Sequence, residues 1–443
     1  MRRTLGLWVG LLVAVAWSSP ARADEVTDWN QAALRAALIG QTSPTTTTRV
    51  MAMVQVAVFD AVNGLDPQYT YFRVDPASAP VGGSKRAAAV QAAYAMLTRL
   101  YGSGAATPNA AQQAAFDARR NVSLGEIANQ DSPASITSGI AWGQFVADQV
   151  FAWRSTDGFS MTAPFPDGTL PGQWRRTPNL PVSPALSVAG AGYIQLSHQV
   201  PWAMASPSAF RPAPPPSLSS AQYAADFNEV KTMGSLTSTA RTQEQTDNAL
   251  FWNSATVSYL WHNVTVSLIV RGQNDEDHRK SFASRGRNGI VESARILGAL
   301  SVAMADATIG CWDAKYVYAY WRPITAVRDL ADDGNPATTS DPNWMPLFAT
   351  PGHPDYPSGH SCNSGAAAAL LSHEFGEHTP FTVESDVMLG VTQTYHGPAD
   401  ALERIKEARI YSGIHFRTAT QVGTELGAAV ANYVLENKFQ KVN

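Results

Sequence analysis

The chain has 443 residues, of which 45% are hydrophobic and 15% charged, and its formal net charge is −4. This composition is typical of an ordered globular protein that is long enough to bury a large core. The mildly acidic balance argues against partners with a dense negative charge, so we expect no nucleic acid and no anionic membrane surface as a partner.

The N-terminus has the pattern of an export signal. Two arginines precede an apolar run from Leu5 to Trp17, and Ala21-Arg22-Ala23 supplies a small-x-small cleavage site. The run is too short to span a bilayer comfortably. Residues 1–23 are therefore predicted to be the signal peptide of an exported protein, periplasmic or secreted, with no stable membrane span after cleavage. In an oxidising compartment Cys311 and Cys362 either pair or remain two buried thiols, and the sequence leaves both open.

Apolar residues recur at three- and four-residue spacing along most of the chain, which predicts helices, and clear alternating strands are scarce. A proline-rich stretch from Arg154 to about Leu218 cannot contain a long helix. We expect an all-α protein of two packed helical bundles, with residues 24–215 forming the first bundle and the proline-rich connecting loop, and residues 216–443 forming the second. The predicted helices are Asp28–Ile39, Arg49–Asn63, Lys85–Tyr101, Thr137–Trp153, Ala221–Met233, Ser238–Val270, Gly289–Trp321, Ser358–Phe375, Ala399–Tyr411 and His415–Lys438.

The proline-rich loop is longer than ordinary connections in compact domains. Such loops are typically covers over a substrate site or straps between bundles. Trp174, Tyr193 and Trp202 are expected to anchor it by burial.

Two cations lie at the end of the long helix predicted over Gly289–Trp321. Lys315 and Arg322 are seven residues apart, or two helical turns, so both are expected on one face of that helix. Taken alone, two such cations are most often solvated surface charges. Here aromatic side chains surround them, which indicates burial, and a buried cation needs a partner of opposite charge. These aromatic residues are Trp312, Tyr316, Tyr318, Tyr320 and Trp321.

The segment from Pro354 to Ser361 has the features of a helix N-terminus that binds an anion. Pro357 ends extended chain, Ser358 is placed to start a helix, and Gly359 lets the backbone approach a ligand closely. Free N–H groups and the helix dipole favour negative charge there. His360 lies in the first turn, within reach of a bound anion. Without the other segments, the same pattern describes a capping serine beside a surface histidine.

Arg409 and His415 form the third segment. Six residues do not return a helix to the same face, so both side chains reach one site only if the helix breaks, and Gly413 offers the break. In isolation, the same residues describe an arginine in a salt bridge and a histidine in the core.

Together, K-x6-R-P, P-S-G-H and R-x5-H occur in an order that is hard to obtain by chance. Three cations match the three equatorial oxygens of a bound anion, and two histidines remain for attack on, or ligation of, its central atom and for proton transfer. The sequence therefore predicts one pocket for a tetrahedral oxyanion, formed by Lys315, Arg322, Ser358, Gly359, His360, Arg409 and His415.

From Asp306 to Arg417 this pattern resembles the vanadium-dependent haloperoxidases and the acid phosphatases of the phosphatidic acid phosphatase type 2 group. The segment Phe59–Asn63 resembles exported bacterial haloperoxidase-like members. The resemblance implies an all-α double bundle and an oxidoreductase that takes hydrogen peroxide and a halide, with vanadate as cofactor and phosphate as an alternative occupant. It implies His415 as the vanadium ligand, His360 as the acid–base group, Lys315 as the residue that polarises the peroxide, and the following residues as partners of the vanadate oxygens: Lys315, Arg322, Ser358, Gly359 and Arg409.

Four positions bear on the choice within this group. The acid that phosphatases usually carry four residues after the histidine is Ala419 here, so a nucleophilic His415 would lack its usual support. The family's serine before the arginine is Ala408. Trp312 resembles chloroperoxidases and His353 resembles bromoperoxidases, so these two are predicted to line the halide pocket, with bromide slightly favoured.

We therefore predict a vanadium-dependent haloperoxidase. The first alternative is an acid phosphatase acting on a phosphate ester, in which His415 becomes phosphorylated and His360 protonates the leaving alcohol. The second is a non-catalytic oxyanion-binding protein. The sequence leaves the formation of homo-oligomers open.

Overall fold

The structure, a computed structural model, describes residues 24–165, 167–176, 192–253, 257–274, 289–328, 333–385 and 388–442. The signal peptide predicted over residues 1–23 lies outside this part of the chain. The described part is helical apart from two short strands and irregular connections, so the predicted all-α class is confirmed.

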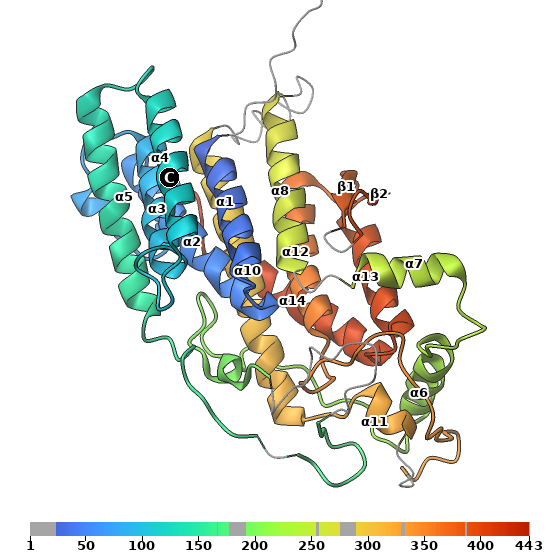
Figure 1. Cartoon of the computed structure of the whole chain (residues 1–443). Coiled ribbons are helices and arrows are strands. Elements are labelled where there is room, and N and C mark those ends of the chain that lie inside the picture. The colour runs from blue at the N-terminus through green and yellow to red at the C-terminus, as the bar shows by residue number, and fades with distance from the viewer. Residues whose placement is uncertain are drawn as a thin grey trace, which may run out of the picture.

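The first half of the chain forms a group of helices that Figure 1 shows in blue to teal. A polar side chain caps the start of each helix by accepting a hydrogen bond from a backbone N–H group of the first turn, which would otherwise lack a partner. These caps are Asp24, Ser43, Ser84, Asn109 and Ser132. The helices are α1 (Glu25–Ile39), α2 (Pro44–Leu65), α3 (Lys85–Leu100), α4 (Ala110–Ile127) and α5 (Pro133–Arg154).

The second half contributes the helices drawn from green to red on the other side of Figure 1. Among them, α12 and α14 approach so closely that only glycine fits at position 427. A Cβ atom there would lie only 2.0 Å from the carbonyl oxygen of Cys362. Cys362 and Cys311 are both buried free thiols, which resolves the choice left open by the sequence. The helices are α6 (Ala221–Met233), α7 (Gln243–Phe251), α8 (Val257–Asn274), α10 (Ile290–Tyr318), α11 (Pro323–Arg328), α12 (Gly359–Phe375), α13 (Pro398–Tyr411) and α14 (Arg417–Asn437).

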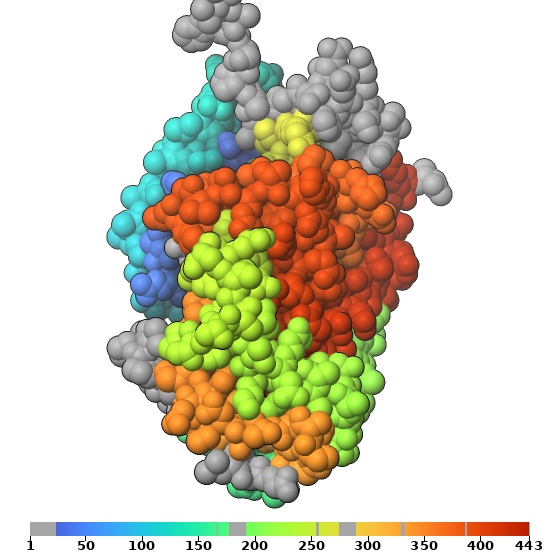
Figure 2. Space-filling model, turned by 90° about the vertical axis from the view of Figure 1, so that its right-hand side faces the viewer, coloured from blue at the N-terminus to red at the C-terminus, as the bar shows by residue number. Residues whose placement is uncertain are grey.

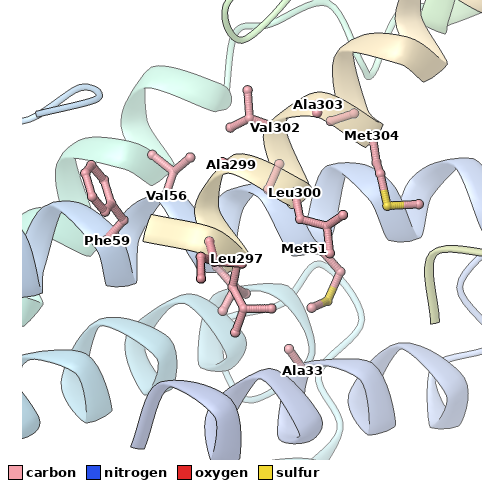
Figure 3. Packing of buried hydrophobic residues seen from close by; sticks show 14 of the residues in the cluster. Ala33, Met51, Val56, Phe59, Leu297, Ala299, Leu300, Val302, Ala303 and Met304 are labelled. Atoms are coloured by element: carbon pink, nitrogen blue, oxygen red, sulfur yellow. The ribbon is translucent and has the colours of Figure 1, made fainter. Parts of the chain in front are cut away.

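Helices α2 and α10 pack against each other at the centre and join the two halves. Figure 3 shows Met51 and Phe59 of α2 beside Leu297 and Leu300 of α10, all within one hydrophobic cluster that contains residues of both halves. By length and composition α10 is the one described helix that would suit a membrane span, but its apolar stretch is fully buried inside the fold. The division of the chain at residue 215 stays a prediction.

Two buried aspartates tie loops to these central helices. Asp60 on α2 accepts hydrogen bonds from the backbone N–H groups of residues 72–74, at 2.7, 2.8 and 2.9 Å. Asp306 on α10 accepts three from residues 202–204, at 2.7, 2.8 and 2.9 Å. Burial raises the pKa of each carboxyl to about 6, while the three N–H groups act in the opposite direction. The proline-rich loop is thus attached to α10, where Trp202 is buried as expected.

The C-terminal end of the chain returns to the first group of helices. Lys441 pairs with Tyr69 in an isolated antiparallel bridge. The ring of Phe439 lies 4.7 Å from that of Phe59 and 5.2 Å from that of Phe72, measured between centroids. Figure 1 accordingly shows the C-terminus among the first-half helices. The last residues therefore complete the apolar core of the first half.

Several elements differ from the predictions, among them the short helix α11, which the predicted helices do not include. The helix predicted over Ser238–Val270 is two helices, α7 and α8. Helix α4 is absent from the predicted elements because most of its residues are exposed, which leaves few apolar positions to mark a period. The hairpin of β1 (Phe381–Glu384) and β2 (Thr392–Tyr395) is also absent, because strands of four residues are too short to show a clear alternation.

Candidate active site

The first two site cations lie on either side of the end of α10. Lys315 is in the last turn of α10, which ends where Ala319 adopts a left-handed conformation with φ 45°. Arg322 lies beyond the helix, directly before α11. The prediction that both cations share one face of a single helix is therefore wrong. Both are nevertheless fully buried and contact the same segment, residues 353–355.

The hydrogen bonds of these two cations go to neutral acceptors. Lys315 donates from Nζ to the carbonyl oxygens of Pro354 (2.8 Å) and Asp355 (3.0 Å). Arg322 donates from Nε to the carbonyl oxygen of His353 at 2.8 Å. Burial removes the water that would stabilise each charge, which lowers the pKa of Lys315 to about 8 and that of Arg322 to about 10. Both side chains would be stabilised by a further negative charge.

The predicted helix N-terminus is present as α12. Ser358 caps it, since its Oγ accepts a hydrogen bond from the N–H of Ser361 at 3.4 Å. A Cβ atom at Gly359 would lie 3.0 Å from the ring of Trp312, so glycine allows the helix to begin tightly against that ring. His360 is partly exposed and lies in the first turn.

The break predicted at Gly413 is also present. Its φ is +74°, and a Cβ atom there would lie 2.4 Å from the carbonyl oxygen of Gly234, so only glycine fits. His415 lies in the turn between α13 and α14 rather than inside the predicted last helix. The turn brings His415 beside Arg322, and Arg409 of α13 is close enough to lower the pKa of His415 by its charge.

Arg409 is a buried cation without a carboxylate partner among the described residues. Its Nη1 donates to the carbonyl oxygen of Trp252 at 2.9 Å, while its Nε is buried without a hydrogen-bond partner. Burial, followed by the charge of Arg322, lowers its pKa to about 9. Trp252 follows α7, and Figure 2 shows yellow-green segments of this region lying over the orange and red C-terminal elements. The salt-bridge alternative for Arg409 is thus wrong within the described chain, and its unpaired Nε–H group is suited to donate to an anion.

His415 is buried and contacts groups of both charges. Its Nδ1 lies 2.8 Å from Oδ1 of Asp355, and Nη1 of Arg322 lies 3.2 Å from its Nε2. Burial, followed by the charges of Arg322, Lys315 and Arg409, lowers the pKa of His415 well below its usual value. The imidazole is therefore neutral at neutral pH, and one of its nitrogens keeps a lone pair.

Asp355 belongs to the site, although the motif that contains it gave no reason to assign it a role. It is fully buried, and its Oδ1 lies 3.7 Å from Nη1 of Arg322. Burial raises the pKa of Asp355 to about 7, against the opposing effect of Arg322 and Lys315. The available signal was its place: an acid shortly before the anion-binding helix start at Ser358 needs a specific partner.

The two residues predicted to line a halide pocket lie together. The ring centroids of Trp312 and His353 are 5.1 Å apart. Nη2 of Arg322 lies 3.0 Å from Nδ1 of His353, and burial, followed by the charges of Arg322 and Lys315, lowers the pKa of His353 well below its usual value. The indole N–H of Trp312 donates to the carbonyl oxygen of Gly192 at 3.4 Å. The proline-rich loop therefore borders the site, as expected for a cover.

The site as a whole has more positive than negative charge. Lys315, Arg322 and Arg409 surround the neutral His415, and Asp355 is the one carboxylate of the described chain within ion-pair distance of these cations. An oxyanion such as phosphate or vanadate fits this donor set, since it would supply the missing charge and an acceptor for the free N–H of Arg409. The described residues contain no group of three His, Cys, Asp or Glu side chains that could hold a metal cation.

Comparisons with known proteins agree with this architecture. The family model described as the VCPO second helical-bundle domain matches residues 295–443. Vanadium chloroperoxidase from Curvularia inaequalis is 24% identical, over 83% of this chain and 69% of that protein.

Two solved structures have the same fold. The crystal structure of the first bacterial vanadium-dependent iodoperoxidase gives a TM-score of 0.71 at 24% identity, covering 95% of this chain and 98% of that one. A holo-type bacterial vanadium-dependent chloroperoxidase gives 0.63 at 16% identity, covering 89% and 91%. Residues 295–443 are thus similar to the second helical-bundle domain of the vanadium chloroperoxidases, and the chain shares the fold of the vanadium-dependent haloperoxidases.

Proposed function

We propose that the chain is a vanadium-dependent haloperoxidase, which uses hydrogen peroxide to oxidise a halide at a vanadate held in this site. The observation that carries the proposal is the surplus of buried positive charge around the neutral His415, together with the unpaired Nε of Arg409. The similar chloroperoxidases and the iodoperoxidase are named as vanadium enzymes, which supports vanadate as the anion.

In this proposal the residues have distinct tasks. His415 is the protein ligand of vanadium, because its neutral imidazole offers a lone pair. His360, in the first turn of α12, transfers protons to and from the reacting oxygen. Vanadate, when bound, supplies a Lewis acid that activates hydrogen peroxide, and the oxidation state of vanadium does not change. The oxyanion is held by Lys315, Arg322, Ser358, Gly359 and Arg409.

We further propose that bromide binds beside Trp312 and His353 and is preferred over chloride. His353 is the group that supports this preference, since the resembling chloroperoxidases tend to have phenylalanine there. Measuring kcat/KM for chloride, bromide and iodide tests the preference directly. Replacing His353 by Phe should move it toward chloride, and an unchanged ratio would contradict the proposal.

A phosphatase remains the second candidate because of one contact. Asp355 lies 2.8 Å from Nδ1 of His415 and supplies the carboxylate that Ala419 lacks. His415 therefore has a carboxylate nearby although position 419 is an alanine. A phosphorylated His415 with His360 as the acid would use the same pocket.

Two assays on the purified protein separate these functions. The first measures peroxide consumption with and without bromide and added vanadate, and the second measures hydrolysis of a phosphate monoester. Halide-dependent consumption that requires vanadate supports the haloperoxidase. Ester hydrolysis that vanadate inhibits, with no halide oxidation, would establish the phosphatase instead. Anion binding without either activity would leave an oxyanion-binding protein.

We also propose that the protein is exported after cleavage behind Ala23. Mass spectrometry of the protein recovered from the periplasm and the medium should find Asp24 as the first residue. An uncleaved chain retained in the cytoplasm would contradict this.

A further inference from the structure

We infer that Trp252 is a positioning residue of the anion site: its backbone carbonyl oxygen holds one end of the Arg409 guanidinium, so that the Nε edge is left for the bound oxyanion. Tyr395 of the β1–β2 hairpin in turn restrains Trp252. The inference rests on the proposed function only in requiring that an oxyanion occupies the site, and it applies equally to the phosphatase candidate.

The contact between Trp252 and Arg409 orients the cation without neutralising it. Nη1 of Arg409 donates to the carbonyl oxygen of Trp252 at 2.9 Å, whereas Nε is buried without a partner. Arginine binds an oxyanion best through two parallel N–H groups on one edge of the guanidinium. Because Nη1 is held by the carbonyl oxygen, the edge that contains Nε is the one left for such a pair. A neutral acceptor also leaves the positive charge of Arg409 for the ligand.

The backbone of Trp252 is fixed where α7 ends. Its N–H donates to the carbonyl oxygen of Asn248 at 3.1 Å, as the residue that caps the helix. Asn248 also attaches α7 to α13, the helix that carries Arg409, because its Nδ2 donates to the carbonyl oxygen of Arg404 at 2.9 Å. Figure 1 shows α7 and α13 next to each other. The carbonyl group of Trp252 and the backbone of Arg409 are therefore held in place relative to each other.

The side chain of Trp252 is held by the hairpin. Its indole N–H donates to the hydroxyl oxygen of Tyr395 on β2 at 3.1 Å, and both side chains are buried. The hydroxyl group of Tyr395 donates onward to Gln393, and its backbone pairs with Phe381 of β1. A buried indole whose N–H is paired has one favoured orientation. The hairpin thus restrains the residue whose carbonyl oxygen holds Arg409.

The test uses Trp252→Phe and Tyr395→Phe in the full-length mature protein, each alone and combined with Arg409→Met. Trp261→Phe is the matched control, because this equally buried tryptophan of α8 also packs against the hairpin but donates its indole N–H to Ser364 of α12 at 3.0 Å. Calorimetry measures the affinities for vanadate and inorganic phosphate. NMR of ¹⁵N-arginine-labelled protein follows the Nε–H signal of Arg409 during a phosphate titration, and steady-state kinetics give kcat and the KM for halide.

Trp252→Phe should weaken the binding of both anions by about 3–10-fold and Tyr395→Phe by about 2–5-fold, the range expected when one hydrogen bond no longer restrains a charged group. Beside Arg409→Met, the same substitutions should change affinity less than about twofold, because they act through Arg409. The KM for halide should also change less than about twofold. Trp261→Phe should lower stability and keep the wild-type affinity. In the wild type, phosphate should shift the Nε–H signal of Arg409.

Four results would overturn the inference. These are wild-type affinity in folded Trp252→Phe, an equal loss beside Arg409→Met, an equal loss in Trp261→Phe, and phosphate binding that leaves the Nε–H signal of Arg409 unmoved. If Trp252→Phe does not fold, Tyr395→Phe and its double variant decide by the same criteria. A wild-type protein that binds neither anion would instead overturn the proposed function.

Discussion

In both halves of the molecule a buried aspartate on the central helix binds the backbone of a loop, but the two helices differ in length. Asp60 on α2 and Asp306 on α10 each accept three backbone N–H groups from one loop. Helix α2 ends at Leu65, shortly after its aspartate, whereas α10 continues to Tyr318. The extension of α10 carries Trp312 and Lys315, and Arg322 lies just beyond it. The aspartate contact fixes a loop in each half, and only the longer helix α10 also carries residues of the site.

The two halves also differ in how completely the hydrogen-bond donors of their buried arginines are paired. Arg154, at the end of α5, lies 2.8 Å from Asp157, donates to two carbonyl oxygens and packs over the ring of Trp202. Arg409 has one carbonyl partner and a free Nε. A buried charge whose partners all come from the protein has a structural role, whereas one with an unfilled bond marks a ligand site.

The largest effect is expected for the site histidine compared with a structural one. His415→Ala should lower turnover by at least about 10³-fold, because it removes the ligand or nucleophile. His262 is the control, since it is also fully buried but its ring nitrogens contact the carbonyl oxygen of Ser258 and the hydroxyl of Ser301. His262→Gln should lower the melting temperature and leave turnover per folded molecule unchanged. Equal turnover in His415→Ala and wild type would remove the whole assignment.

The two aspartates should separate stability from activity. Asp60→Ala and Asp306→Ala should each lower the free energy of unfolding by about 3–5 kcal/mol, because three buried N–H groups lose their acceptor. Only Asp306→Ala should also lower turnover of the folded fraction, since it releases the loop that borders Trp312. Urea unfolding and kinetics at matched folded fraction measure both effects. An equal loss of turnover in the two variants would contradict the expectation that only the Asp306 contact affects the site.

The two arginines should respond in opposite ways to removal of charge. Arg409→Met should weaken vanadate and phosphate binding by about 10–100-fold while stability is kept or increased, because an unpaired buried charge is removed. Arg154→Met should lower stability by about 3–5 kcal/mol, since it leaves Asp157 buried without that partner, and should not affect anion affinity. Calorimetry and chemical unfolding of both variants provide the check. Weaker binding in Arg154→Met alone would reverse the assignment.

The smallest effect is a pH dependence that comes from Lys315. Its pKa is about 8 in the folded protein, against an ordinary value of 10.5, so the unfolded chain binds more protons between these values. Without an anion, stability relative to Lys315→Met should therefore increase as pH rises from about 8 to 10.5. Anion affinity should fall over the same interval, because the cation loses its proton. A constant difference between the two proteins across this range would contradict the expectation.

Much of the site could be predicted because it depends on local chain geometry. Ser358 caps a helix, and Gly413 breaks one, through rules that act within a few residues. The position of Arg322 was predicted to follow from helix periodicity, but α10 ends at Tyr318 and the tertiary contact with residues 353–355 sets the position instead. The contact of Asp355 with His415 joins residues that are distant in sequence, so the local pattern shows only that a buried acid there needs a partner.

The fold, like the site, can be predicted only where it depends on local sequence patterns. Helices α2 and α10 can be predicted from the sequence because they are long apolar stretches, which the fold buries on nearly all sides. The Asp60 and Asp306 contacts, and the return of Phe439 to Phe59, join segments that no local rule connects.

The return of Phe439 and Lys441 to the first group of helices also sets an order of events during synthesis. The aromatic ring that fills the space beside Phe59 and Phe72 is made only after the last described helix, α14. The first half therefore cannot reach its final packing before Phe439 has been made. A chain that stops before Phe439 would leave the core beside Phe59 and Phe72 incomplete, and limited proteolysis should attack its N-terminal half first.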